Sequence, residues 1–412
     1  MTFNTLFSTV TTYGKKIVVC GAVGFLATTA MAQTRLFQTG DASGFPYRIP
    51  AIATAANGQL VALTDRRPCG ADIGFGRVDI LGRTSDDNGA TWSEPFNVLV
   101  GSGKGADAGY GDACLVADQK RMELLLVCVS GDTPYWKSTV DKSQRLMVTH
   151  AHWDKKSKSW KWDTPTDLTH HVYRDLLGGR INGLFMGSGR ICQSRQVKVG
   201  DYYRVYGALC THKGNYVLYS DDFGRNWNVL GSAVESCAPK GDEPKCEELP
   251  DGSVLLSSRK NGGRYFNIFK YSDAKTAKGE WGEVTDSRTV EKGIKNQGTP
   301  CNGEIMILKA KNAEGKRTHV ALQSVPAGPD RTNVTIYWKE LADASDYDTP
   351  KNFSSNWDGH YQVSHASSAY STMTLQKDGR IAFYWEEYGR KNGYDMFYEA
   401  LSIEKITGGK LK

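Results

Sequence analysis

From residue 33 onward, short apolar or alternating runs are separated by turn residues. Clear examples are the runs 59–63 (QLVAL) and 124–128 (LLLVC), and typical turn pairs are Asn57-Gly58 and Asp251-Gly252. No stretch of this region sustains the 3.6-residue apolar period of a long helix. The chain's 20 tyrosines and 10 tryptophans also suit pleated sheet. The pattern therefore predicts an all-β protein.

An internal repeat decides between the possible β architectures. Residues 85–92 (SDDNGATW) match residues 220–227 (SDDFGRNW) in the pattern S-x-D-x-G-x-[TN]-W. The Asp can cap turn amides, the Gly can take a positive φ, and the Trp can pack beneath a hairpin. The copies start 135 residues apart, or two units of about 67 residues, and weaker echoes occur at 153–160 and 272–281. Such a unit holds one blade, so we expect a six-bladed β-propeller of four-stranded antiparallel blades.

The first 32 residues have the features of a secretion signal peptide. Lys15 and Lys16 precede an uncharged apolar run, 17–30, which ends in the cleavage pattern Ala30-Met31-Ala32. The run of about 14 residues falls short of the ~20 that span a membrane. Cys20 lies early in the run, after bulky residues, which disfavours lipid attachment there. We expect 1–32 to be removed, leaving a domain over 33–412 that is periplasmic or secreted and has no transmembrane anchor.

Charge and cysteine content exclude several classes of function. The net charge is +6, or about +4 without the two signal lysines, which is too modest and dispersed for a nucleic-acid partner. Eight cysteines remain after residue 32, an even number that permits disulfides in an exported protein. Cys237 and Cys246 flank a Pro/Gly-containing loop and are the pair we expect to bond. No Cys or His spacing indicates a metal site.

Tyr370 and three distant arginines indicate a binding site for a carboxylated sugar. Arg48, Arg259 and Arg331 lie in separate repeat units, and three converging guanidiniums would bind a carboxylate strongly. A tyrosine beside them could attack a sugar carbon that bears a carboxylate, where an Asp or Glu nucleophile would meet charge repulsion. Sialic acid is the sugar that fits this chemistry.

The chain resembles the bacterial exo-sialidases (neuraminidases) from about Arg48 to Glu386. Residues 47–50 (YRIP) are similar to the F/Y-R-I-P motif, 85–92 and 220–227 to the Asp boxes, and 370–372 (YST) to the Tyr-Ser-Thr of the last blade. The resemblance implies an exo-α-sialidase that hydrolyses terminal α-ketosidic sialic acids with retention, through a covalent tyrosyl-sialoside. It implies sialylated glycoproteins, glycolipids or oligosaccharides as substrates, and no metal or organic cofactor. Residues 33–412 would be the catalytic domain.

The resemblance also assigns roles to single residues. Tyr370 is the expected nucleophile, Glu243 its base and Asp72 the acid/base, while Arg48, Arg259 and Arg331 bind the carboxylate. The expected contacts to the rest of the sugar are Arg67, Asp112 and, as a platform for the N-acetyl group, Trp136. Glu386 should hold Arg48, because a buried guanidinium needs a carboxylate partner.

Several alternatives stay open at this point. Glu247 and Glu248 rival Glu243, while Arg288 and Arg317 rival Arg331 but lack a following strand signal. Residues 181–190 depart from the proline-containing pattern of the family's third blade, so no residue is assigned to the glycerol side chain. The functional alternatives are a sialyl-transferring relative and a non-catalytic Asp-box propeller that binds glycans. The non-catalytic alternative predicts that a catalytic residue type is missing, whereas all of them are present in order.

Overall fold

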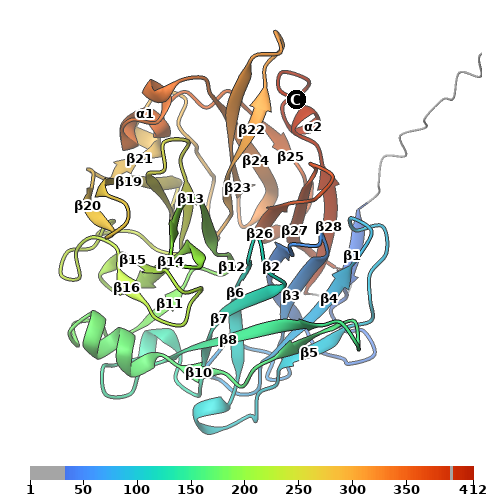
Figure 1. Cartoon of the computed structure of the whole chain (residues 1–412). Coiled ribbons are helices and arrows are strands. Elements are labelled where there is room, and N and C mark those ends of the chain that lie inside the picture. The colour runs from blue at the N-terminus through green and yellow to red at the C-terminus, as the bar shows by residue number, and fades with distance from the viewer. Residues whose placement is uncertain (1–32, 390–392) are drawn as a thin grey trace, which may run out of the picture. The chain divides into compact units, whose positions relative to one another are not determined.

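A computed structural model describes residues 33–389 and 393–412, so the predicted signal peptide, 1–32, lies outside the described residues. The described residues form six sheets arranged as blades around a centre (Figure 1). Their strands pair antiparallel, apart from one short parallel pair in the second sheet along the chain. The predicted six-bladed β-propeller is confirmed. No helix in these two segments is long and apolar enough to cross a membrane.

The elements follow the chain blade by blade. Blade 1 contains β2 (Tyr47–Thr54), β3 (Leu60–Arg66), β4 (Asp79–Ser85) and β5 (Phe96–Leu99). Blade 2 contains β6 (Tyr110–Ala117), β7 (Glu123–Ser130), β8 (Arg145–Asp154), β9 (Ser159–Trp162), β10 (Thr166–Asp167) and β12 (Gly189–Arg190). Blade 3 contains β11 (Leu184–Met186), β13 (Cys192–Val199), β14 (Tyr202–Thr211), β15 (Gly214–Ser220) and β16 (Asn228–Val229).

The second half of the ring is built in the same way. Blade 4 contains β17 (Pro244–Glu248), β18 (Val254–Lys260), β19 (Gly263–Asp273), β20 (Lys278–Trp281) and β21 (Thr285–Asp286). Blade 5 contains β22 (Ile305–Lys311), β23 (Arg317–Gly328), β24 (Thr332–Leu341) and β25 (Gly359–Gln362). Blade 6 contains β26 (Ser368–Leu375), β27 (Ile381–Tyr388), β28 (Tyr394–Leu401) and β1 (Thr34–Phe37). The helices are α1 (Pro350–Ser354), α2 (Ile403–Ile406), a π-helical turn (His171–Leu176) and 3₁₀ turns at Gly105–Asp107, Tyr135–Lys137, Ser287–Thr289 and Ala344–Asp346.

The blades differ in strand number, and the two ends of the chain meet in one of them. Blades 1, 5 and 6 have the expected four strands, whereas blades 2, 3 and 4 carry extra short strands. In blade 6 the first described strand, β1, pairs antiparallel with β28, Thr34 lying opposite Tyr398. The hydrogen bonds of this strand pair therefore close the ring.

The two copies of the sequence repeat form the same turn. In the first copy, Ser85 Oγ donates to Asp87 Oδ1 (2.8 Å) and accepts from the Gly89 amide (2.8 Å), while Trp92 Nε1 donates to the Gly89 carbonyl (3.2 Å). The corresponding distances in the second copy, at Ser220, Asp222, Gly224 and Trp227, are 2.7, 2.8 and 3.0 Å. Both glycines have a φ of +84°, which favours glycine.

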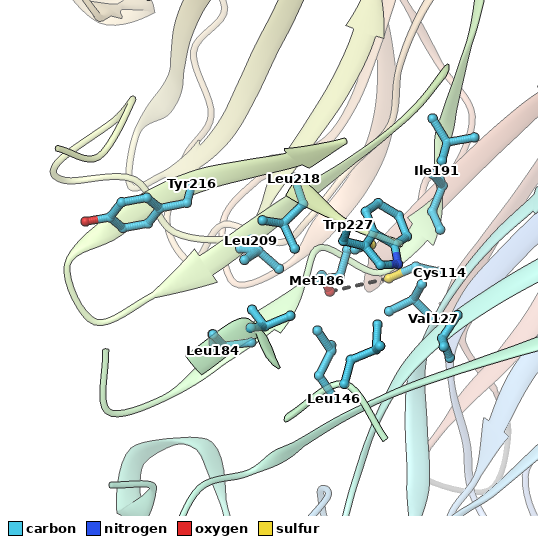
Figure 2. Packing of buried hydrophobic residues seen from close by; sticks show 14 of the residues in the cluster. Cys114, Val127, Leu146, Leu184, Met186, Ile191, Leu209, Tyr216, Leu218 and Trp227 are labelled. Carbon is cyan, nitrogen blue, oxygen red and sulfur yellow. Dashed lines mark hydrogen bonds between the residues drawn. The ribbon is translucent and has the colours of Figure 1, made fainter. Parts of the chain in front are cut away.

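Apolar side chains fill the spaces between neighbouring blades. Figure 2 shows the cluster between blades 2 and 3, where Val127 and Leu146 of blade 2 face Leu209, Leu218 and Trp227 of blade 3. All five side chains are buried, with exposed fractions of 2% or less. Burial of such area between blades is the main stabilising term of the fold. It also leaves the innermost strands free to carry polar side chains toward the centre.

The predicted disulfide between Cys237 and Cys246 is wrong in this structure. All eight cysteines of the described region are free thiols, and these two are buried with Cys192 in an apolar cluster. Cys237 Sγ donates instead to the Asn215 carbonyl (3.2 Å). Burial raises the pKa of Cys246 well above its ordinary value, because the thiolate would lose its water. The pair behaves as small apolar core residues.

Candidate active site

Three innermost strands carry a β-bulge where a predicted site residue occurs. The pairing register shifts between Arg48 and Ala51 in β2, between Gly111 and Cys114 in β6, and between Ser368 and Ser371 in β26. A bulge adds one residue and redirects the local side chains. Ile49 and Asp112 adopt positive φ angles of 59° and 53°, which are uncommon for residues with a Cβ. These irregular positions surround one cavity.

Tyr370 and Glu243 meet in the middle of this site. Tyr370 Oη donates a 2.6 Å hydrogen bond to Glu243 Oε1, and both side chains are more than nine-tenths buried. Burial, followed by the negative charge of Glu243, raises the pKa of the Tyr370 phenol well above 10. The phenol is therefore neutral in the free protein, and its deprotonation must be coupled to proton transfer to Glu243.

Arg259 binds both members of this pair. Its Nη1 lies 2.9 Å from Glu243 Oε2 and 3.4 Å from Tyr370 Oη, and its Nε lies 3.2 Å from Asp242 Oδ2. The sheet register sets this arrangement, because the Arg259 amide donates to the Glu243 carbonyl across the β17–β18 hairpin (2.8 Å). Burial is the largest single effect and opposes the charge of Arg259, but Glu243, Tyr370 and Asp242 together outweigh it and raise the pKa of the guanidinium. Arg259 therefore stays cationic.

The two rivals of Glu243 have other partners. Glu247 pairs with Arg190 and with Arg195 (2.8 Å), and Glu248 accepts a hydrogen bond from the Arg195 amide (2.8 Å). Both carboxylates are fully buried in these contacts, and neither lines the cavity. The geometry therefore favours Glu243 as the base.

Arg48 is held in place by Glu386. Arg48 Nε and Nη2 donate to the two Glu386 carboxylate oxygens at 2.8 and 3.2 Å. The same carboxylate accepts hydrogen bonds from the backbone amides of Ile49 (2.6 Å) and Tyr370 (3.3 Å). One fully buried side chain thus fixes Arg48 and the backbone of Tyr370 together. Tyr394, which sequence reasoning missed, covers the guanidinium, with Arg48 Cζ 4.9 Å from its ring centroid.

Arg331 completes the group of three arginines. It lies between β23 and β24 with a φ of 58°, and its Cζ is 5.8 Å from the Tyr370 ring centroid. The corresponding distance from Arg48 is 5.7 Å. Within the described segments, Arg331 has no carboxylate partner at salt-bridge distance, so its charge is available to a ligand. Its rivals do not line the cavity: Arg288 pairs with Asp286 (2.8 Å), and Arg317 starts β23.

Asp72 lines the cavity from the loop after β3. Its side chain is 48% exposed, and Oδ1 is 3.1 Å from Arg67 Nη2. The same Arg67 nitrogen is 3.1 Å from Oδ2 of the buried Asp65. One guanidinium therefore bridges a buried carboxylate and the expected acid/base. Sequence reasoning missed Asp65, although it lies near the end of β3, two residues before Arg67.

Asp65 also anchors Asp112. The Asp112 amide lies 3.2 and 3.3 Å from the two Asp65 carboxylate oxygens. Burial raises the pKa of Asp65 to about 7, although Arg67 opposes the shift. Burial, followed by the charge of Asp72, raises the pKa of Asp112 well above its ordinary value. Three carboxyls around one guanidinium make this side of the cavity sensitive to protonation.

These residues enclose a cavity of about 330 Å³, a volume at the lower end of small-molecule sites. All ten predicted site residues except Glu386 line it, and Glu386 lies behind Arg48. The lining that sequence reasoning missed consists of Ile49, Ile73, Tyr135, Gln144, Phe185 and Asp242. The spacing of β strands gives no signal for these residues, since Ile49 lies in the bulge of β2, Phe185 lies in the short strand β11, and the others come from loops and turns.

Comparison with known proteins fits this geometry. The chain is 25% identical to a curated sialidase of Paraclostridium sordellii over 375 residues, which is 87% of this chain and 85% of that protein. Among solved structures, a Hadza microbial sialidase, Hz136, matches with a TM-score of 0.70 at 19% identity, covering 91% of this chain and 69% of that one. The intramolecular trans-sialidase of Ruminococcus gnavus matches with a TM-score of 0.70 at 15% identity, covering 90% and 98%. No family model matches the chain.

Fold and site together define a six-bladed β-propeller protein whose cavity is lined by arginines, tyrosines and several carboxyl groups. The sequence relatives are curated sialidases, and they support a glycoside hydrolase of sialidase type. The solved structures support the fold.

Proposed function

We propose that this chain is an exo-α-sialidase that releases terminal sialic acid with retention of configuration. The observation that carries the proposal is the Tyr370–Glu243 hydrogen bond, surrounded by the guanidiniums of Arg48, Arg259 and Arg331. These cations suit a substrate whose reacting carbon bears a carboxylate. The YRIP segment at 47–50 and the two repeat turns also fit the motifs of this family.

The first half-reaction forms a bond between Tyr370 Oη and the anomeric carbon. As Oη attacks, its proton passes along the 2.6 Å hydrogen bond to Glu243 Oε1. The bond to the leaving oxygen breaks at the same time, and Asp72 supplies a proton to that oxygen. Arg259 stabilises the negative charge that moves between Glu243 and Tyr370, because its Nη1 contacts both groups.

The second half-reaction returns the site to its starting state. Asp72, now a carboxylate, takes a proton from a water molecule, which attacks the anomeric carbon. The bond to Tyr370 breaks, and Glu243 returns the proton to the phenol oxygen. Two inversions at one carbon give net retention. The 48% exposure of Asp72 gives this side chain access to both the leaving group and solvent.

Transfer to an acceptor other than water is the second candidate function. The motivating observation is the fold match to an intramolecular trans-sialidase, since both reactions share the covalent intermediate. We favour hydrolysis because Asp72 is open to solvent. We also propose that the protein is exported, on the strength of the predicted signal peptide.

The test is incubation of the purified protein with an aryl α-sialoside that releases a fluorescent phenol. Product analysis by NMR should show free sialic acid, first formed as the α-anomer. A first-formed β-anomer would contradict the retaining mechanism, and a transferred or anhydro product would favour the second candidate. No fluorescence from a folded protein would contradict sialoside cleavage altogether.

A further inference from the structure

Two large aromatic side chains are exposed at the mouth of the cavity. Phe75 is 48% exposed and Trp136 is 60% exposed, and their ring centroids are 5.7 Å apart. They come from different blades, one from the loop after β3 and the other from the loop after β7. Large apolar side chains that contact one another while exposed to solvent often mark a binding surface.

The backbone sets the positions of these two rings. Gly74 has a φ of +96°, and a Cβ at this position would lie 2.3 Å from the backbone nitrogen of Pro134. The two loops therefore touch through their main chains, next to Phe75 on one side and two residues before Trp136 on the other. Contact at this distance is possible only for glycine. The aromatic pair is thus held ready in the absence of a ligand.

The pair lies on the side of the cavity where the leaving group must sit. The Phe75 amide donates to the Asp72 carbonyl (3.3 Å), so Phe75 belongs to the turn that begins at the proposed acid. Asp72 acts on the oxygen that joins sialic acid to the rest of the glycan. The first ring beyond that oxygen is therefore within reach of Phe75 and of Trp136, which lines the cavity.

A second apolar wall of the cavity is enclosed rather than exposed. Ile73 is 2% exposed, and the Tyr135 and Phe185 rings meet edge to face at 4.9 Å. This wall suits a small buried group such as the acetyl methyl. The open aromatic pair suits a ring that continues into solvent.

We propose that Phe75 and Trp136 form a subsite for the first sugar ring of the leaving glycan, a pyranose that presents a face of C–H bonds. Such a face is apolar and slightly positive, and it stacks on the negative face of an aromatic ring. The proposal rests on the proposed sialidase function. It gives Trp136 a role at the leaving group in place of the N-acetyl platform expected from the resemblance.

The test compares two substrates that share the sialic acid but differ in the leaving group. Sialyllactose carries a pyranose there, and methyl α-sialoside carries none. In the Phe75→Leu, Trp136→Ala and double variants, kcat/KM for sialyllactose should fall about tenfold more than kcat/KM for methyl α-sialoside. Trp136→Phe should restore much of the difference. Leu375→Ala, at a side chain that is 44% exposed and outside this cavity, is the matched control.

An inhibitor that contains the sialic acid but no leaving group distinguishes the two roles considered for Trp136, the leaving-group subsite and the N-acetyl platform. The 2,3-dehydro analogue of sialic acid has the acetamido group but no leaving group, so Trp136→Ala should change its Ki less than threefold. An equal fall in kcat/KM for both substrates, or a rise in Ki that matches that fall, would overturn the subsite. Release of sialic acid from neither substrate by the unaltered protein would contradict the sialidase function itself, and the subsite with it.

Discussion

Tyr370 and Glu243 are 127 residues apart in the chain, yet a 2.6 Å hydrogen bond joins the phenol to the carboxylate. One belongs to blade 6 and the other precedes the first strand of blade 4, so the bond links two blades that are not consecutive along the chain. Its geometry depends on closure of the propeller by β1 and β28. The chemistry of the site is therefore tied to the integrity of the whole fold.

This relationship predicts strongly non-additive effects of two substitutions. Tyr370→Phe removes one oxygen and with it covalent attack, while Glu243→Gln leaves the phenol without its base. Both interrupt a single proton-coupled step, so the double variant should be about as slow as the slower single variant. The measurement is kcat/KM on an aryl sialoside, with Tyr203→Phe in β14, outside the site, as control. Additive losses would separate the two residues.

The identity of the nucleophile has its own direct measurement. A 2,3-difluorinated sialic acid slows both half-reactions, and the fluoride leaving group favours the first, so the covalent intermediate should accumulate. Peptide mass spectrometry should then find the sugar on Tyr370 and no adduct in the Tyr370→Phe protein. Attachment to another residue would refute Tyr370 as nucleophile.

A third prediction concerns the shape of the Arg259 guanidinium. Arg259 Nη1 contacts both Glu243 and Tyr370, and its Nε faces Asp242. Lysine keeps the charge but not the planar fork of donors. Arg259→Lys should therefore lower kcat/KM about ten- to hundredfold, the equivalent of one charge-assisted hydrogen bond. Arg380→Lys is the control, because Arg380 pairs with Asp378 at a hairpin turn (2.7 Å). An unchanged kcat/KM for the folded Arg259→Lys protein would exclude Arg259 from carboxylate binding.

Much of the propeller could be predicted because its signals are local. The repeat at 85–92 and 220–227 fixes the size of a blade through turn chemistry that the structure reproduces. The 16-residue spacing between Glu243 and Arg259 reflects a β-hairpin that places them side by side. Such spacings can be read without knowledge of distant contacts.

The remaining features of the site and core depend on contacts between segments that are distant in the sequence and that no local pattern links. Asp65 is linked to Asp112 because the β6 bulge brings the Asp112 amide to its carboxyl group. Tyr394 covers Arg48 because blade 6 packs beside blade 1. Cys237 and Cys246 lie in one apolar cluster without bonding, which loop composition cannot reveal.

Glu386 links stability to activity. Its carboxylate accepts four hydrogen bonds from Arg48, Ile49 and Tyr370, and it is fully buried. Glu386→Gln leaves the Arg48 charge without its partner, so we expect a loss of about 3–5 kcal/mol in the free energy of unfolding. Chemical denaturation measures this loss, and kcat/KM should fall with it. Glu399→Gln, which loses a pairing only with the half-exposed Lys405, should cost much less. Equal costs for the two variants would contradict a special role for Glu386.

The last prediction is a pH dependence of stability that arises from Asp65. Burial raises the pKa of Asp65 to about 7 in the folded protein, whereas an unfolded aspartate titrates near ~4. Between these values the folded state binds more protons than the unfolded state, so stability falls as pH rises from about 4 to about 7. The groups facing Asp65 are Arg67, Asp72 and Asp112. Loss of the Asp65 charge also removes one of the effects that raise the pKa of Asp112.

Asp65→Asn should therefore flatten this dependence. The thermal unfolding midpoint should be higher at pH 5 than at pH 7.5. This difference should be larger for the unaltered protein than for Asp65→Asn. The slope is the diagnostic quantity, because the variant also replaces a carboxyl oxygen that contacts Arg67 (3.1 Å), and this changes stability by an amount separate from the titration. Asp378→Asn, at the exposed hairpin turn, is a control that should keep the original slope. A slope unchanged by Asp65→Asn would show that this carboxyl is ionised across the whole range, held so by Arg67.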